Sequence, residues 1–253
     1  MKTHFKNARL INPETGTDTI GDLFIADGLI VDSCTPDDVI DCGGKCLAPG
    51  IVDIGVKVSE PGERHKESFA SAGRAAVAGG ITTIITRPDT DPAIDTPEVL
   101  EFVERRAAID AAVNVLPMAA LTKGRLGCEM TEIGFLMDAG AVAFTDCDRV
   151  ITDTKVFSRA LTYAKSCGAL VIGHVQEPGL SAGGSVNAGK FAALRGLAGI
   201  SPMAERMGLD RDIALLEMTG AAYHVDQITT ARALPALERA KANGVDITAG
   251  VGV

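Results

Sequence analysis

The hydrophobic and polar positions follow two different patterns along the chain, and the change falls near residue 50. Before it, short β-type apolar runs are separated by the turn sequences NPETG and ADG. The ADG turn lies between two apolar runs, which is typical of a β-hairpin. We therefore predict a small β-subdomain over residues 1–49 and a larger part over residues 50–253.

The larger part alternates strand-like apolar runs with helical runs. Predicted strands lie at residues 50–58, 81–88, 113–121, 141–146, 169–176, 221–229 and 245–253. Predicted helices lie at residues 66–80, 98–109, 129–140, 155–168, 201–219 and 230–244, and a Gly-rich loop at 177–200. Helices that follow strands in this way cover the faces of a parallel sheet.

The number of units favours a barrel. Six complete strand–helix units and the start of a seventh are typical of a (β/α)8 TIM barrel. The alternative is a doubly wound sheet, which places a Gly-rich phosphate loop after its first strand, and VKVSEPGERHKES has no such loop. An eighth strand and the last helices are missing, so we expect an incomplete barrel. Either the chain is a fragment of a longer protein, or another chain closes the barrel.

Composition and charge narrow the classes of function. The chain has 253 residues, of which 46% are hydrophobic and 23% charged, as in ordinary globular proteins. A net charge of -9 without a basic cluster argues against nucleic acid and anionic membranes as partners. No apolar run approaches the ~20 residues of a membrane span, and MKTHFKNARL lacks the apolar core of a signal peptide. The six cysteines form no CxxC pair, so we expect a cytoplasmic protein with reduced thiols.

Polar side chains near the carboxyl ends of the predicted strands are the candidates for chemistry, because barrel active sites lie there. They are Asp53, Lys57, Ser59, Arg87, Asp89, Asp146, Cys147, Asp148, His174, Glu177, His224, Asp226 and Gln227. Of the four histidines, only His174 and His224 lie on predicted barrel strands. Together with Cys147 and an aspartate they could bind one zinc ion. The structural alternative is a pair of hydrogen-bonded core histidines and a buried, apolar cysteine.

Seven stretches in order along the chain carry a resemblance. They are APGIVDIGVKVSEPG, KES, AGGITT, RPDTDPAIDTPEV, AGAVAFTDCD, VIGHVQEPGL and YHVDQITTARAL. Together they resemble the dihydroorotases of the long bacterial type, within the cyclic amidohydrolase family, over essentially the whole chain. The resemblance implies a place in pyrimidine biosynthesis. It also implies a metal-dependent-hydrolase-type (β/α)8 barrel, here with strands 1–7 only, beside a small β-sandwich built from both chain ends. Residues 1–49 would be the N-terminal part of that sandwich.

The resemblance also implies where the family binds its metal ions. Its first strand carries Asp-x-His-x-His, and both histidines bind zinc. Here Asp53 is kept, but Gly55 and Lys57 stand at the two histidine positions. The family's fourth strand ends in two aspartates, of which the second bridges the metals, and here Cys147 follows Asp146.

The remaining ligand positions lie on the fifth and sixth strands. The family's fifth-strand histidine is kept here as His174. The family's sixth strand reads His-x-x-His-x-Ser, and the second histidine is the metal ligand. Here His224 matches the first histidine, and Gln227 stands at the ligand position. Because a protonated Lys57 repels Zn²⁺, we expect no metal cofactor. A single zinc ion on His174 and Cys147 is the remaining alternative. The family's catalytic aspartate lies on the eighth strand, beyond these residues, so no catalytic residue is assigned.

Both substrate-binding positions that the resemblance implies are altered as well. The family has an arginine for the substrate carboxylate where this chain has Ser59. Its second strand ends in Met-Pro-Asn-Thr, with the asparagine on the substrate, and here the sequence is Arg87-Pro88-Asp89-Thr90. An aspartate at this position repels an anionic substrate.

These substitutions favour a non-catalytic, dihydroorotase-like subunit. The resemblance points to degenerate dihydroorotases that assemble with aspartate transcarbamoylase, so we expect a homo- or hetero-oligomer. The first alternative is an active zinc amidohydrolase for dihydroorotate or a related ring, with its metal on some of His174, Cys147, Asp146 and His224. The second is a ligand-binding module whose pocket, with Lys57, Arg87 and Asp89, takes a different small molecule.

Overall fold

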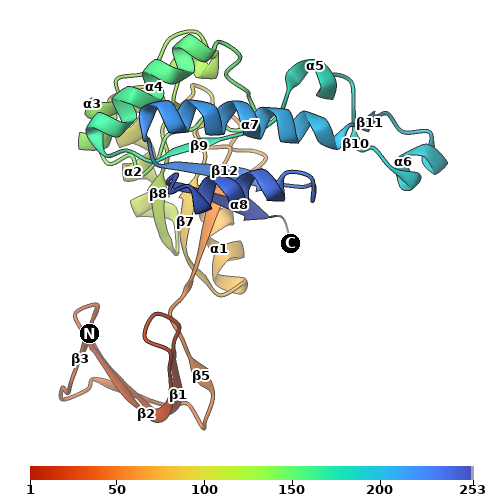
Figure 1. The fold of residues 1–253 in the computed structure, drawn as a ribbon. Helices are drawn as coiled ribbons and strands as arrows, with labels where there is room; N and C mark the ends of the chain where they lie inside the picture. The colour runs from red at the N-terminus through yellow and green to blue at the C-terminus, as the bar shows by residue number, and fades with distance from the viewer. Residues whose placement is uncertain (252–253) are drawn as a thin grey trace. The chain divides into compact units, whose positions relative to one another are not determined.

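The computed structural model describes residues 1–251 and divides the chain into two compact units, Met1–Ile51 and Val52–Val253 (Figure 1). Each unit is described by itself. No helix among the described residues is long and apolar enough to cross a membrane.

The first unit is a five-stranded sheet. It contains β1 (Lys2–Asn12), β2 (Thr17–Ala26), β3 (Leu29–Val31), β4 (Asp38–Asp41) and β5 (Cys46–Leu47). The strand order is β3-β2-β1-β4, with β5 also paired to β1. The predicted ADG hairpin is confirmed, because antiparallel β2 and β3 are joined by Asp27 and Gly28 at φ 52° and 82°. Both values lie in the left-handed region that a two-residue hairpin turn requires.

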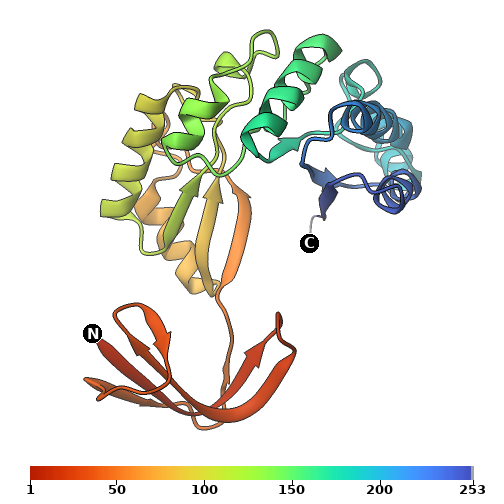
Figure 2. The ribbon, with the colours of Figure 1, turned by 60° about the vertical axis from the view of Figure 1, so that its left-hand side comes forward.

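The second unit places a row of strands inside a layer of helices (Figure 2). One sheet has the order β6 (Ile51–Val56), β7 (Ile81–Thr86), β8 (Asn114–Pro117). The other has the order β13 (Ile247–Val251), β12 (Tyr223–Ile228), β9 (Val171–Gly173). The pairs β7–β8, β9–β12 and β12–β13 are parallel, as predicted. Within residues 1–251 no pairing joins β6 to β13, so the row does not close into a barrel.

The segment predicted as the fourth strand is not a regular strand, and that prediction is wrong in detail. Its residue Phe144 forms isolated parallel bridges to Ala119 on one side and Val171 on the other, which link the two sheets. The ladder stops there because the chain turns away at Asp146 and Cys147. Cys147 has φ 60°, outside the extended region that a strand needs.

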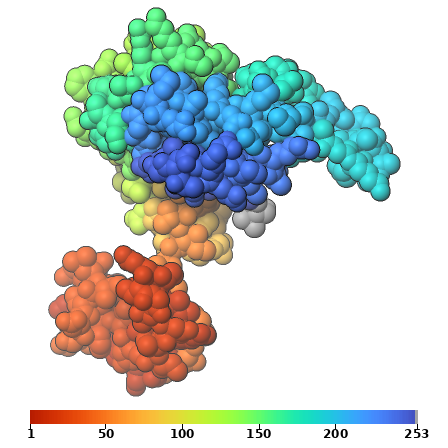
Figure 3. All heavy atoms as spheres, in the orientation of Figure 1, coloured from red at the N-terminus to blue at the C-terminus, as the bar shows by residue number. Residues whose placement is uncertain are grey.

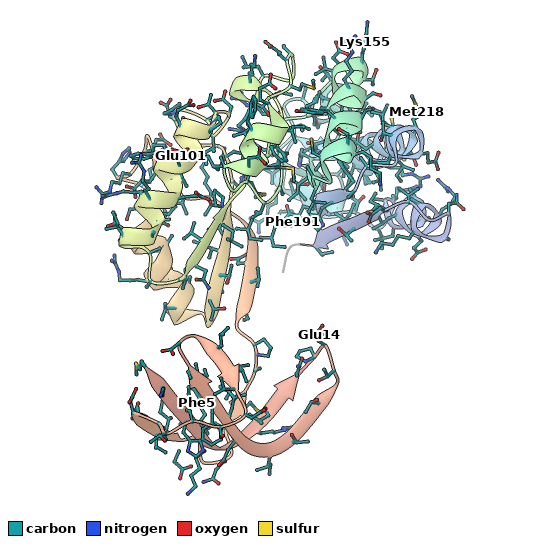
Figure 4. All side chains as sticks on the ribbon, turned by 90° about the vertical axis from the view of Figure 1, so that its left-hand side faces the viewer. Phe5, Glu14, Glu101, Lys155, Phe191 and Met218 are labelled. Carbon is teal, nitrogen blue, oxygen red and sulfur yellow. The ribbon has the colours of Figure 1, made fainter. Side chains whose placement is uncertain are left out.

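The helices pack their apolar faces on the strands. They are α1 (Phe69–Ala78), α2 (Pro97–Asp110), α3 (Ile133–Asp138), α4 (Thr154–Cys167), α7 (Pro202–Thr219) and α8 (Leu234–Ala242), which confirms the six predicted helices. Glu101 on α2 and Lys155 on α4 lie on the outer faces (Figure 4), while residues such as Leu100, Leu161 and Leu216 are fully buried. The outer surfaces of α7 and α8 form one continuous face (Figure 3).

The predicted Gly-rich loop contains regular structure, which corrects the prediction for residues 177–200. It forms α5 (Pro178–Ser181), β10 (Val186–Asn187), α6 (Lys190–Arg195) and β11 (Gly199–Ile200), with β10 parallel to β11. Gly196, at φ 63°, ends α6 in the left-handed conformation. Two two-residue strands therefore pair within this segment, whereas its glycine content had suggested an irregular loop.

One glycine inside α7 marks a close contact between helix and strand end. A Cβ atom on Gly208 would lie 2.4 Å from the Gln176 nitrogen and 2.8 Å from its Cα. Backbone atoms at these distances cannot move aside as a flexible side chain can. The helix is thus able to approach the residues after β9 only because position 208 has no side chain.

We predict that Gly208→Ala destabilises the protein by about 1–3 kcal/mol. The overlap outweighs the gain of roughly 1 kcal/mol that alanine brings to a helix interior. The control is Gly189→Ala, which has extended φ 170° and no heavy atom within 4 Å of the added Cβ. Urea unfolding of both variants measures the difference. Equal stability of Gly208→Ala and the wild type would show that the contact is looser than described.

Candidate functional site

The carboxyl ends of the strands surround a cavity of 400 Å³, which we call the strand-end cavity. Its polar lining comes from Arg87, Thr145, Cys147, His224, Asp226 and Gln227, and Gly55 and Gly250 contribute backbone. Apolar side chains from β6, β9 and β13, together with Met118 after β8, form the remaining wall. The structure thus brings several of the predicted candidates to one place, at the edge where chemistry occurs in such folds.

The first-strand positions provide no metal donor. Gly55 has no side chain, and its φ of 88° places it in the left-handed region. Lys57 follows β6, and its Nζ lies 2.9 Å from Asp89 Oδ2, so the ammonium is held by a carboxylate. A charged ammonium has no lone pair for a metal ion. Asp53, the residue kept from the family pattern, is exposed on β6.

Cys147 is buried at the wall of the strand-end cavity. Burial raises the pKa of its thiol to about 11, and the neighbouring Arg87 guanidinium only partly opposes this shift. The thiol is therefore protonated at neutral pH, and zinc would have to displace a more tightly held proton than that of an ordinary cysteine. The adjacent Asp146 is engaged elsewhere. Its carboxylate accepts hydrogen bonds from the backbone of Leu121 at 3.1 Å and Thr122 at 3.0 Å, and from the Thr122 hydroxyl.

His174, the one matching ligand position, uses both ring nitrogens within the protein. Nδ1 lies 3.0 Å from Asp226 Oδ2, and Nε2 lies 3.1 Å from Gln176 Oε1. Both partners are acceptors, so the arrangement favours the doubly protonated ring. The hydrogen bond to Asp226 raises the pKa of His174 above its usual value, although burial opposes this. His174 is thus hydrogen-bonded on both nitrogens, although its side chain is 28% exposed and does not lie in the core.

The sixth-strand candidates differ from each other. His224 Nδ1 lies 2.7 Å from the Thr248 hydroxyl, and burial lowers the pKa of this histidine. Gln227 is exposed and lines both the strand-end cavity and a neighbouring 250 Å³ cavity that His174 also lines. A glutamine amide is a weak replacement for an imidazole ligand of zinc.

The two altered substrate positions lie outside the lining of the strand-end cavity. Ser59 is buried, and its carbonyl oxygen accepts a hydrogen bond from the Glu63 backbone. The Asp89 side chain is 4% exposed and pairs with Lys57 and Arg87. Glu177, another candidate, caps α5 by accepting a hydrogen bond from the Leu180 nitrogen at 2.6 Å. None of the three faces the cavity as a binding group.

The residues at the family's metal positions do not fit a metal centre. Among residues 1–251, no group of three or more His, Cys, Asp or Glu side chains could hold a metal ion. The donors that remain are a protonated thiol, a histidine occupied on both nitrogens and an amide. Such a set lacks the several anionic or imidazole ligands that zinc requires.

One charged residue near the strand ends, Arg125, was missed in the sequence. Arg125 lies in the 3-10 turn η1 (Lys123–Arg125) after β8, and its Nη2 lies 2.8 Å from Asp148 Oδ1. It also donates to the Asp146 carbonyl oxygen at 3.1 Å. Arg125 lies shortly after the third predicted strand. The other candidates were selected because they lie near the carboxyl ends of predicted strands, so the same rule could have identified Arg125.

We predict that the Cys147 thiol resists alkylation. At pH 8, iodoacetamide should modify exposed Cys46 and Cys128 but leave Cys147, which is 5% exposed and protonated at this pH. Peptide mass spectrometry before and after denaturation measures each site. Alkylation of Cys147 in the native protein as fast as Cys128 would contradict the assigned burial and pKa.

We predict that Asp226→Asn lowers the pKa of His174. A raised folded-state pKa stabilises the protein below the unfolded pKa of about 6.5, and this stability is lost as the pH rises through the higher folded value. The wild type should therefore lose more unfolding free energy between pH 6 and pH 8 than Asp226→Asn does. Urea unfolding at both pH values and NMR titration of His174 measure this. Exposed Asp138→Asn is the control, and an unchanged His174 titration in Asp226→Asn would refute the pairing.

Comparisons with known proteins identify the family. The Dihydro-orotase-like family matches residues 44–233. A dihydroorotase from Syntrophobacter fumaroxidans is 39% identical over 97% of this chain and 58% of its own length. A dihydroorotase from Solibacter usitatus is 38% identical over 98% of this chain and 59% of its own length. The chain thus spans less than two thirds of these curated relatives.

Solved structures support the fold. The L-hydantoinase from Arthrobacter aurescens has a TM-score of 0.81 at 22% identity, covering 99% of this chain and 58% of that one. A D-hydantoinase has a TM-score of 0.74 at 24% identity, covering 98% of this chain and 57% of that one. At this identity the likeness concerns the fold, an α/β architecture of the TIM-barrel type that is not closed here. The match over residues 44–233 shows the family: the chain belongs to the dihydroorotase-like proteins.

Proposed function

We propose that this chain is a non-catalytic, dihydroorotase-like subunit of pyrimidine biosynthesis. One observation carries the proposal: the positions that bind metal in the family hold side chains that are absent, cationic, protonated or already paired. Gly55 offers no donor, Lys57 pairs with Asp89, and His174 is bonded on both nitrogens.

The chemistry of cyclic amide hydrolysis explains why these changes matter. The amide must be attacked by water, and in this family a metal centre lowers the pKa of that water to make it a nucleophile at neutral pH. None of the cavity side chains of this chain substitutes for that centre. His174 is the nearest candidate base, but it does not line the strand-end cavity, and both of its ring nitrogens are engaged by Asp226 and Gln176.

The residues at the family's substrate-binding positions also argue against activity on dihydroorotate. A ring that carries a carboxylate needs cationic or neutral donors, and the family positions for these hold buried Ser59 and Asp89. Arg87 is the cation that lines the cavity, and its Nη2 lies 3.1 Å from Asp89. Its charge is thereby largely neutralised within the protein.

A scaffold function needs the fold and its surfaces, and both are compatible with the substitutions. The core is continuous from α1 to α8 and contains fully buried Leu100, Phe144 and Leu216. We propose aspartate transcarbamoylase as the partner, since degenerate dihydroorotases of this class assemble with it. The alternative of an active zinc amidohydrolase relies on His174 alone among the family ligands.

We expect fewer than about 0.1 tightly bound metal ions per chain and no hydrolysis of dihydroorotate. The test is elemental analysis and a turnover assay on the same sample of the full-length protein, before and after incubation with Zn²⁺. A dihydroorotase that retains the Asp-x-His-x-His sequence is the positive control. Co-purification with aspartate transcarbamoylase tests the partner separately. Turnover of dihydroorotate by the zinc-loaded protein would refute the non-catalytic assignment.

A further inference from the structure

Five charged side chains of alternating sign run across the carboxyl ends of the strands, and we call them the strand-end ion network. They are Lys57, Asp89, Arg87, Asp148 and Arg125. Lys57 Nζ and Arg87 Nη2 lie 2.9 and 3.1 Å from Asp89 Oδ2. Arg87 Nη2 and Arg125 Nη2 lie 3.6 and 2.8 Å from Asp148 Oδ1.

The network joins segments that are distant in sequence. Lys57 follows β6, Arg87 and Asp89 follow β7, and Arg125 lies in η1 after β8. Asp148 follows the bridged segment of Phe144. Four consecutive strand ends are therefore connected by ion pairs, and Arg125 adds hydrogen bonds to the Asp146 carbonyl oxygen. The pairs hold together the edge of the unit that surrounds the strand-end cavity.

Asp89 is the most buried member of the network. Its side chain is 4% exposed, and its two cations, Arg87 and Lys57, are 27% and 54% exposed. A buried carboxylate depends on its cations, so removing Lys57 weakens the pairing although Arg87 remains 3.1 Å from the same oxygen. The pair of Lys66 and Glu63 differs, because its side chains are 57% and 47% exposed. Exposed pairs of this kind contribute little.

We propose that the Lys57 ammonium, which stands at a metal-ligand position of the family, acts as a structural cation that connects the ends of β6 and β7. It supplies the positive charge that neutralises a buried carboxylate, and through Asp89 and Arg87 it connects neighbouring strand ends. The inference rests on the proposed loss of the metal centre and gives its physical consequence. The folded state then needs no divalent cation, and the lysine charge itself opposes one.

The test is a double-mutant cycle on the full chain. We expect Lys57→Met to lower Tm by about 2–4 °C, because a domain of this size loses a few degrees for a modest loss of stability and Arg87 still pairs with Asp89. Asp89→Asn should also lower Tm. The double variant should lose clearly less than the sum of both single losses, since each substitution breaks the same pair. Lys66→Met is the control and should stay within about 1 °C of the wild type.

Two further measurements separate the network from a metal effect. EDTA and added Zn²⁺ should leave the Tm of the wild type unchanged. Hydrogen exchange of Lys57→Met should show faster exchange at residues 86–90 and 145–149, which the control should not. A Tm for Lys57→Met equal to that of Lys66→Met, strictly additive losses, or a fall in Tm on chelation would each overturn the inference. Dihydroorotate turnover would instead refute the proposed function and leave the measured coupling in place.

Discussion

The buried carboxylate of Asp89 imposes the constraint on which the arrangement of this site depends. A side chain that is 4% exposed cannot rely on water to stabilise its charge. Lys57 and Arg87, at neighbouring strand ends, supply the positive charges that pair with it, and Arg87 also lies close to Asp148. Once these cations are committed to aspartates, they are not available for an anionic ligand. The burial of Asp89 therefore explains the charge pairing at these strand ends.

Other contacts that stabilise the second unit do not involve the altered positions. Glu205 on α7 is buried and accepts hydrogen bonds from the backbone and hydroxyl groups of Thr229 and Thr230, which follow β12. Asp212 on the same helix accepts a hydrogen bond of 2.6 Å from the hydroxyl of buried Tyr223. These contacts fix α7 to the sheet whatever residues stand at positions 55, 57 and 147. A fold of this type can thus retain its packing while the chemistry at its strand ends changes.

Periodicity was sufficient for the elements whose apolar pattern is long and regular. The strand of Ile81–Thr86 and the helices α2, α4 and α7 appear where the pattern predicts them. It failed at residues 141–146, where Asp146 bonds to the backbone of Leu121 and Thr122 and the strand ends early. It also failed at 177–200, where short pairings outweigh the glycine content. In the first segment, contacts between residues distant in sequence determine the backbone conformation, and in the second, very short strand pairings do. A local hydrophobic pattern carries no information about such contacts.

At the candidate site, too, the sequence predicted some features and not others. The identity of each family position follows from the aligned motifs, but the partner of each side chain does not. His174 is the clearest case. Its position matches a metal ligand of the family, which would suggest that a ligand survives. In the structure, however, its two ring nitrogens contact Gln176 and Asp226, and Asp226 lies 52 residues further along the chain. The histidine therefore has a role in the folded protein without any metal, and its presence is not evidence for catalysis. The same reasoning applies to Asp146, whose carboxylate fixes the segment after β8 and does not face the cavity.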